Sequence, residues 1–367
     1  MAEYTPRELV ARAFMHEETP RVPFSLGFGI NPPARQKLSE YLGHASVSQT
    51  DEMLSRYDDV RRAYVPYVGP PNRNRTMQNG ITVDIWDVWR KPVSYSADGE
   101  YHEICRYPLA EAKTTADLDA FDWPDPDWFD YQAIPEILER INPGGRYAIR
   151  LGNCSVFESA WYMRGFERTL QGFALEPELI AKIFKRVAAY QTEFYSRALE
   201  AAKGGIDIAF TADDIAGQNG MLISPETWSA QIMPWHKKIN GALKSFGAKI
   251  LYHTDGAAQS AIGGMIEMGA DGWEALQLDA KGMDAREIKK EASGKLLLHG
   301  GISVQRLLPF GNPDEVRSEI FELTKIFSAG GGYIAAPSHA VQAGTPPENI
   351  VAMLEAARPD LGPIKRA

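Results

Sequence analysis

The feature that most constrains this chain is a recurring format in which a short apolar run ends in polar residues. The run at 249–252 is too short for a typical helix and is followed at once by His-Thr-Asp-Gly at 253–256. Runs of similar format lie at 147–153, 207–214, 272–277, 296–301 and 331–339. When strands alternate with helices and carry polar residues at their carboxyl ends, the economical arrangement is a (β/α)₈ barrel with its active site on that face.

The length fits one such barrel. The chain has 367 residues, and a barrel of this kind with insertions takes up most of such a length as one domain. We therefore predict an α/β fold, a (β/α)₈ TIM barrel with an N-terminal helical and loop extension. It would form a single domain over 1–367, with residues 1–145 carrying the helical and hairpin insertions.

Local signals place several elements along the chain. Thr5, Ser224, Asn312 and Thr345 are each followed by proline and an acidic residue, a pattern typical of a helix start. The periodicity and the turn residues further predict a first strand at 20–29, helices at 32–42, 51–62, 157–167 and 177–203, an irregular loop at 64–77, and a hairpin at 93–107 that turns at 97–99.

Composition excludes several classes of protein. The formal net charge is −9 and no lysine or arginine cluster is present, which argues against a nucleic-acid partner and against a basic membrane-binding patch. No apolar run approaches the length needed to span a membrane, and no secretory leader pattern is visible. With two cysteines, Cys105 and Cys154, a disulfide framework is implausible, so we expect a cytoplasmic protein.

Candidate metal ligands lie at the strand ends. His253 and Asp255 follow one strand, Glu274 lies on the next, and His339 follows the last. This nitrogen and oxygen set suits Zn²⁺ or a similar divalent ion. The alternative is that His253 and Asp255 bond to each other and to the backbone, while Glu274 pairs with an arginine.

Carboxylates at other strand ends are candidates for proton transfer. Asp213 and Asp214 form an acidic pair, in which one member is expected to act as acid or base and the other to cap the following turn. Asp84 is either a catalytic contact or a loop anchor. Arg150 can bind a carboxylate bidentately or form a structural ion pair with Asp213, and His299 is either a buried histidine or a substrate contact.

Motifs spread over nearly the whole chain carry a resemblance. They are Pro-Arg-Glu at 6–8, Asp-Ile-Trp at 84–86, Arg-Gly-Phe-Glu at 164–167, Asp-Asp at 213–214, His-Thr-Asp-Gly at 253–256, His-Gly-Gly-Ile at 299–302 and Gly-Gly-Tyr-Ile-Ala-Ala-Pro-Ser-His at 331–339. Together they resemble the uroporphyrinogen decarboxylase superfamily, which has the (β/α)₈ fold and includes both decarboxylases and corrinoid-linked methyltransferases.

The resemblance implies different roles in the two branches. In the methyltransferases a His-x-Cys pair and a later cysteine bind zinc; here His253 matches the histidine, Asp255 stands at the cysteine, and the later position falls near His339. In the decarboxylases an aspartate holds the pyrrole nitrogens and an arginine-rich segment binds carboxylates. Asp84 is the candidate for that aspartate, and residues 27–31 replace the arginine-rich segment.

The leading hypothesis is an enzyme that moves a methyl group from a small methylated or methoxylated substrate to a corrinoid carried by a partner protein. Zinc would be held by His253, Asp255, Glu274 and His339, and Asp84, Asp214 and His339 are the predicted catalytic residues. The predicted substrate-binding residues are Trp86, Arg150, Trp161, Tyr162, Gln277 and His299. The alternatives are a metal-free decarboxylase that uses Asp84 and His339, and a non-catalytic corrinoid or small-molecule binding subunit. The family resemblance also suggests a homodimer.

Overall fold

A curled parallel sheet forms the centre of the protein. The structure, a computed structural model, describes residues 4–94 and 100–366. The sheet has seven strands in the order β1 (Val60–Ala63), β6 (Ala148–Ser155), β7 (Ile208–Ala212), β10 (Lys249–His253), β11 (Gly272–Leu276), β12 (Leu297–Ile302) and β13 (Tyr333–Pro337). Each neighbouring pair is parallel, so all seven carboxyl ends lie at the same edge. The strands predicted from the repeated format are confirmed, with boundaries shifted by a few residues.

A short extended segment at Phe24 closes the sheet into a barrel. Phe24 bridges in parallel to Ala335 of β13, and its carbonyl accepts a hydrogen bond from the backbone N–H of Asp59, next to β1. The strand predicted at 20–29 is reduced here to a single bridge. Proline at 20 and 23 removes two ladder donors, and Gly27 and Gly29, at φ +56° and +89°, turn the chain away. The predicted (β/α)₈ architecture is confirmed.

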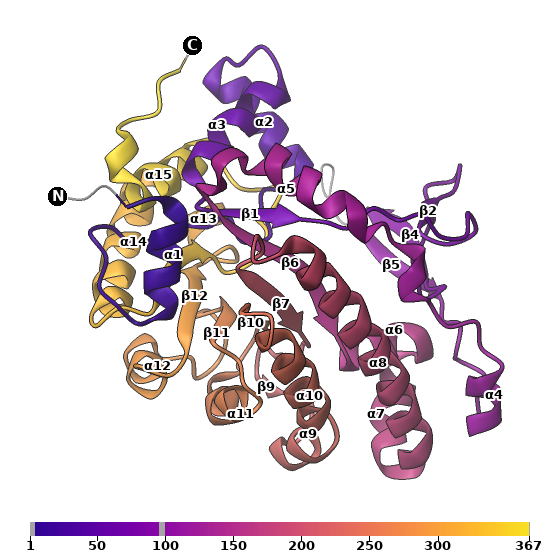
Figure 1. The fold of residues 1–367 in the computed structure, drawn as a ribbon. Coiled ribbons are helices and arrows are strands. Elements are labelled where there is room, and N and C mark those ends of the chain that lie inside the picture. The colour runs from indigo at the N-terminus through magenta and orange to yellow at the C-terminus, as the bar shows by residue number, and fades with distance from the viewer. Residues whose placement is uncertain (1–3, 95–99, 367) are drawn as a thin grey trace.

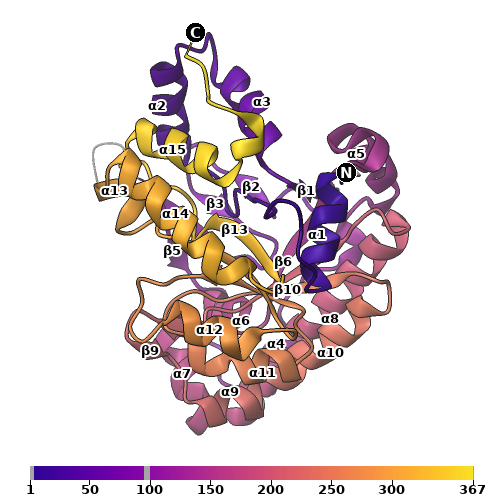
Figure 2. The ribbon, with the colours of Figure 1, turned by 90° about the vertical axis from the view of Figure 1, so that its left-hand side faces the viewer.

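Helices cover the outer face of the sheet (Figure 1). In chain order after β6 these are α6 (Phe157–Arg164), α7 (Phe166–Leu175), α8 (Pro177–Ala202), α9 (Pro225–Gln231), α10 (Met233–Lys244), α11 (Ile262–Glu267), α12 (Ala285–Ala292), α13 (Leu307–Phe310), α14 (Pro313–Ser328) and α15 (Pro347–Ala357). Helices α2 (Pro32–Leu42) and α3 (Val47–Tyr57) pack on each other, and α2 also contacts α15, as Figure 2 shows from the side.

The insertion before β6 is a small antiparallel sheet with two short helices. Its strands are β2 (Arg75–Thr76), β3 (Thr82–Val83), β4 (Trp89–Ser94) and β5 (Glu100–Arg106), in that order, followed by α4 (Thr115–Asp119) and α5 (Ile134–Ile141). A separate short pair, β8 (Ala216–Gly217) and β9 (Gly220–Met221), follows β7. The predicted hairpin is the β4–β5 pair. Its predicted turn at 97–99 lies outside the described residues.

Two local predictions are wrong for physical reasons. The helix predicted at 51–62 ends at Tyr57, and Val60 begins β1 because pairing with Ala148 of β6 outweighs local propensity. The last capped helix begins after Pro346, and the hydroxyl of Thr345 has no hydrogen-bond partner. By contrast, Thr5 caps α1 (Pro6–Phe14) in a reciprocal capping box, as predicted.

The interior of the barrel changes character along its axis. At the amino ends of the strands, Val10 and Phe14 of α1 pack on apolar side chains of the strands, among them Val60, Ile208 and Leu297. Toward the carboxyl ends, the interior instead carries Arg150, His253, Glu274 and His299, all buried. No helix among the described residues is long and apolar enough to cross a membrane.

Candidate active site at the carboxyl ends of the strands

A histidine and a glutamate on neighbouring strands form the centre of the site. His253 ends β10 and is the register partner of Glu274 on β11, so the two side chains lie side by side. His253 Nδ1 is 2.7 Å from Glu274 Oε2, and Glu274 is fully buried. Burial alone would lower the pKa of His253, but the Glu274 and Asp214 carboxylates raise it well above its usual range. Burial raises the pKa of Glu274, while the His253 charge outweighs this effect and lowers it to about 2. The pair is therefore an imidazolium and a carboxylate.

The two adjacent aspartates after β7 lie in different surroundings. Asp213 is buried, contacts His236 Nε2 at 2.5 Å, and accepts hydrogen bonds from the backbone N–H groups of Val156 and Glu158. It thus holds the first turn of α6, and not the following turn that the sequence predicted the structural aspartate to cap. Asp214 faces the site instead, with Oδ1 3.4 Å from His253 Nε2 and its side chain 40% exposed. The predicted ion pair between Arg150 and Asp213 does not form.

Glu158 is a site residue that sequence reasoning missed. It lies in the first turn of α6, is buried, and accepts a 2.7 Å hydrogen bond from the Tyr162 hydroxyl at Oε1. Burial, followed by the nearby Asp214 and Asp213 carboxylates, raises the pKa of Glu158 to about 8. A carboxyl group that is protonated at neutral pH beside an imidazolium is a candidate proton donor. The available signal was an acidic residue inside the apolar and aromatic run at 157–162.

An aromatic side chain, Phe28, lies between the two predicted histidines. Its ring meets His253 edge-on at 5.0 Å between centroids and stacks on His339 at 4.9 Å. The pKa of Asp255 is raised by burial and by the nearby Asp214 carboxylate, with His253 and His339 opposing the shift. The structure therefore brings His253, Glu274, Asp214, Asp255 and His339 into one site, as the barrel topology predicted.

Arg150 lies in the barrel interior beside this site. Its guanidinium carbon is 4.1 Å from the centroid of the Phe210 ring and 5.8 Å from that of Phe28. Burial lowers the pKa of Arg150 to about 10, with Glu274 opposing the shift. Trp161 and Tyr162 contact each other on α6 at 4.2 Å between ring centroids. Tyr162 reaches the site through its bond to Glu158.

Asp84 is a loop anchor in the structure. Its Oδ1 accepts hydrogen bonds from the backbone N–H groups of Trp86 and Val88, and its Oδ2 pairs with Arg90 at 2.7 Å. Arg90 in turn lies over the Tyr162 ring at 4.9 Å. Asp84 is therefore connected to the site only through these side chains. This geometry favours the second of the two predicted roles.

Three predicted substrate-binding residues, Trp86, Gln277 and His299, are buried. Trp86 is buried and packs edge-on against Tyr190 and Trp123 in the core, because its neighbours in the loop are held by Asp84. The amide oxygen of Gln277 accepts hydrogen bonds from the Gly256 backbone and from Gln218, so it supports the loop after β10. His299 is buried, and burial lowers its pKa to about 4, which leaves it neutral.

The predicted zinc ligands do not assemble a complete metal site. Among residues 4–94 and 100–366, no three histidine, cysteine, aspartate or glutamate side chains are grouped closely enough to hold an ion. Both nitrogens of His253 face carboxylates, and Glu274 Oε2 binds His253 Nδ1. The donor set therefore does not fit zinc in this arrangement. Neither predicted alternative holds in full, because Glu274 pairs with His253 rather than with an arginine.

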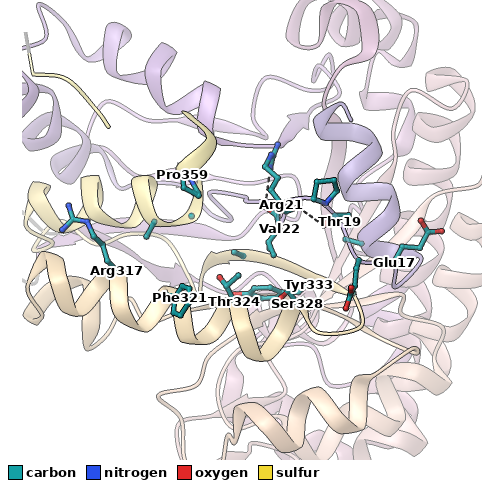
Figure 3. Close-up of a pocket in the computed structure, with 18 of the residues that line it drawn as sticks. Glu17, Thr19, Arg21, Val22, Arg317, Phe321, Thr324, Ser328, Tyr333 and Pro359 are labelled. Atoms are coloured by element: carbon teal, nitrogen blue, oxygen red, sulfur yellow. Dashed lines mark hydrogen bonds between the residues drawn. The ribbon is translucent and has the colours of Figure 1, made fainter. Parts of the chain in front are cut away.

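A cavity that is separate from these residues lies at the other end of the barrel. It has a volume of about 900 Å³ and is lined by residues of α14, α15, the end of α1 and the start of β13. Figure 3 shows Thr19, Arg21, Phe321 and Thr324 on its walls. Because β13 starts at Tyr333, this cavity is near the amino ends of the strands and is separate from the candidate active site.

Comparisons with known proteins agree with this fold. The family model described as uroporphyrinogen decarboxylase (URO-D) matches residues 106–359. The methylcobamide:CoM methyltransferase MtaA of Methanosarcina barkeri is 27% identical over 248 residues, 64% of this chain and 69% of that protein. A uroporphyrinogen decarboxylase of Legionella pneumophila (strain Lens) is 26% identical over 195 residues, 53% of this chain and 51% of its own length. A solved methyltransferase structure from Methanosarcina mazei covers 98% of this chain and 100% of its own, with TM-score 0.68 and 18% identity.

Proposed function

We propose that this chain, which belongs to the uroporphyrinogen decarboxylase family, transfers a methyl group from a small methylated or methoxylated substrate to a corrinoid carried by a partner protein. The observation that carries the proposal is the charge arrangement of the site. The carboxyl groups of Glu274, Asp214 and Asp255 gather around His253, and the guanidinium of Arg62 is bound to the Gly27 carbonyl. A polycarboxylate such as a uroporphyrinogen would meet repulsion there rather than an arginine clamp.

Proton donation is the chemistry that these side chains support. When a methyl group leaves an oxygen or nitrogen atom, the carbon–heteroatom bond breaks, its electron pair stays on the heteroatom, and the methyl group joins the nucleophile of the acceptor. Glu158 would give its proton to that heteroatom and become a carboxylate. The His253 imidazolium, held by Glu274, would stabilise negative charge that develops on the leaving atom. No step depends on a metal.

Methyl transfer can be tested against both alternatives with one set of assays. The protein is incubated with methoxylated aromatic compounds and reduced free cobalamin, and methylation is followed by the visible spectrum of the cobalamin. Methylation that requires the protein supports the proposal. Release of CO₂ without methylation would establish the decarboxylase, and ligand binding without either product would establish the non-catalytic binding subunit.

The role of His253 is tested by His253→Ala. Loss of the imidazolium should lower kcat/KM about 10²- to 10⁴-fold, the usual range for an acid–base or electrostatic group. Zinc binding stays a prediction of the family resemblance, and the zinc content of both proteins, measured by elemental mass spectrometry, tests it. Equal metal content in the two proteins is expected from the geometry. One zinc per chain that is lost in His253→Ala would show that the donors rearrange around an ion.

A further inference from the structure

A buried cation without an anionic partner lies inside the barrel beside the candidate active site. Arg150 is 7% exposed, and its guanidinium contacts the faces of Phe210 and Phe28. Its guanidinium makes no hydrogen bond and no ion pair with any residue that the structure describes. A buried charge is costly unless it is paired, so an arginine held in this state indicates a place for an anionic ligand.

Two further polar groups around Arg150 are also unpartnered. Glu274 Oε1 and His299 Nδ1 are enclosed and have no hydrogen-bond partner among the described residues. Both side chains lie at Gly27, where a Cβ atom would be 3.9 Å from Glu274 Oε1 and 3.9 Å from His299 Cε1. Glu274 acts on Arg150 through its charge but forms no ion pair with it, because its Oε2 is bound to His253. The guanidinium is therefore not neutralised locally.

The neighbouring arginine differs in this respect. Arg62 is the register partner of Arg150 on β1, but its guanidinium donates a hydrogen bond to the Gly27 carbonyl. Of these two arginines, Arg62 is thus occupied by the backbone, whereas the guanidinium of Arg150 has no polar partner among the described residues. A single free guanidinium suits one carboxylate, since its planar fork matches the two carboxylate oxygens.

We propose that Arg150 binds the carboxylate of a small aromatic monocarboxylic acid and that such acids are the substrate class. The inference deepens the proposed function, on which it rests, by naming that class. The ring of the ligand would lie against Phe28 and Phe210, which flank the guanidinium. A second negative charge would be repelled by Glu274, Asp214 and Asp255, so dicarboxylates and phosphates are excluded. The methyl or methoxy group would then face His253 and Glu158.

Calorimetric titration with benzoate and its neutral isostere benzamide tests the anchor without turnover. A charge-assisted pair in a buried site should give a preference of roughly 10- to 100-fold for benzoate over benzamide in the wild-type protein. Arg150→Gln should abolish the preference, and Arg150→Lys should keep part of it because it keeps the charge without the fork. Arg62→Gln is the matched control, expected to weaken both ligands alike and to keep the preference.

Several outcomes would overturn the anchor. They are equal binding of benzoate and benzamide to the wild type, no binding of either ligand, or an unchanged preference in Arg150→Gln. The wild-type comparison decides the matter even if Arg150→Gln does not fold. Failure of the proposed function looks different: Arg150-dependent benzoate binding without methyl transfer from 4-methoxybenzoate would reject methyl transfer and keep the anchor. Equal methyl transfer from 4-methoxybenzoate and anisole would keep methyl transfer and overturn the anchor.

Discussion

Two residues at the strand ends hold protons for opposite physical reasons. His253 is protonated because two carboxylates, Glu274 and Asp214, outweigh its burial. Glu158 is protonated because burial and two like charges disfavour its carboxylate. The site at neutral pH therefore combines a fixed positive charge with a neutral acid. This combination can both stabilise negative charge and deliver a proton.

Glu158→Gln tests the acid directly. Glutamine can occupy the same space beside Tyr162, but it cannot donate a carboxyl proton. At pH 7 we expect turnover to fall about 10²- to 10⁴-fold. Because the acid must be protonated to act, the wild-type rate should fall as the pH rises through about 8, the pKa of Glu158. Measurement of kcat against pH for both proteins checks this, and a wild-type rate that stays constant up to pH 10 would contradict it.

Thermal unfolding detects the same Glu158 proton without any measurement of turnover. The pKa of Glu158 is raised above its ordinary value of 4.5, so the folded state binds a proton that the unfolded state releases. The corresponding stability is present below the ordinary pKa and is lost as the pH rises to about 8. Glu158→Gln lacks this dependence. Its stability relative to the wild type should therefore increase from pH 5 to pH 9, whereas the exposed control Glu167→Gln should show no such trend.

At the scale of secondary-structure elements, barrel closure depends on one buried carboxylate. The closing segment at Phe24 has no long ladder, and its backbone N–H donates to Asp59 Oδ2. Asp59 is fully buried and also pairs with Arg21 at 2.6 Å and with Arg358 at 3.2 Å. It therefore connects the closing segment, the start of β1 and the end of α15. Charge pairing replaces the backbone hydrogen bonds that a full strand would make.

Asp59→Ala should open this junction. Removal of one member of a buried charge network leaves the others uncompensated and costs about 3–5 kcal/mol. We expect that loss in the free energy of unfolding, measured by urea denaturation. The control is Asp51→Ala, which removes a partly exposed ion pair with Arg35 and should cost no more than about 1 kcal/mol. Similar losses in the two variants would show that Asp59 is not the closing contact.

At the scale of the whole molecule, the barrel separates two concave regions. Helix α1 and an apolar layer fill the amino ends of the strands, and the ionisable residues occupy the carboxyl ends. A cavity of about 900 Å³ lies on the amino side, next to α14 and α15. This cavity by itself would therefore have pointed to the wrong end of the barrel. The buried titratable groups and the strand direction identify the active side.

Thr324→Phe tests this separation. Thr324 lines the amino-side cavity, and a phenyl ring there should fill part of it (Figure 3). We expect kcat/KM to stay within about twofold of the wild type, since a surface substitution away from the site has little effect on the rest of the protein. Steady-state kinetics check this. A loss of activity in protein that remains folded would connect this cavity to the reaction.

Sequence reasoning recovered most of the fold but only part of the site. The apolar runs with polar ends predicted the strands, and barrel topology then predicted that His253, Glu274 and His339 would meet. Glu158 was missed because α6, the helix that carries it, is not amphipathic. Its residues are buried on several sides, so no polar face separates an acid from the core. Trp86 was misplaced because its burial depends on contacts with Tyr190 and Trp123, which are distant in sequence.

The sequence by itself determined the class of fold, most of the strands and most of the helix caps, because these depend on local periodicity and on side chains a few residues apart. Tertiary structure decided the protonation and the partners of the site. Whether Glu274 binds His253 or an arginine, whether Glu158 is neutral, and whether Arg150 is paired all depend on desolvation and on distances across the barrel. Those energies arise only when the strands are brought together, so they cannot be inferred from the pattern of residues along the chain.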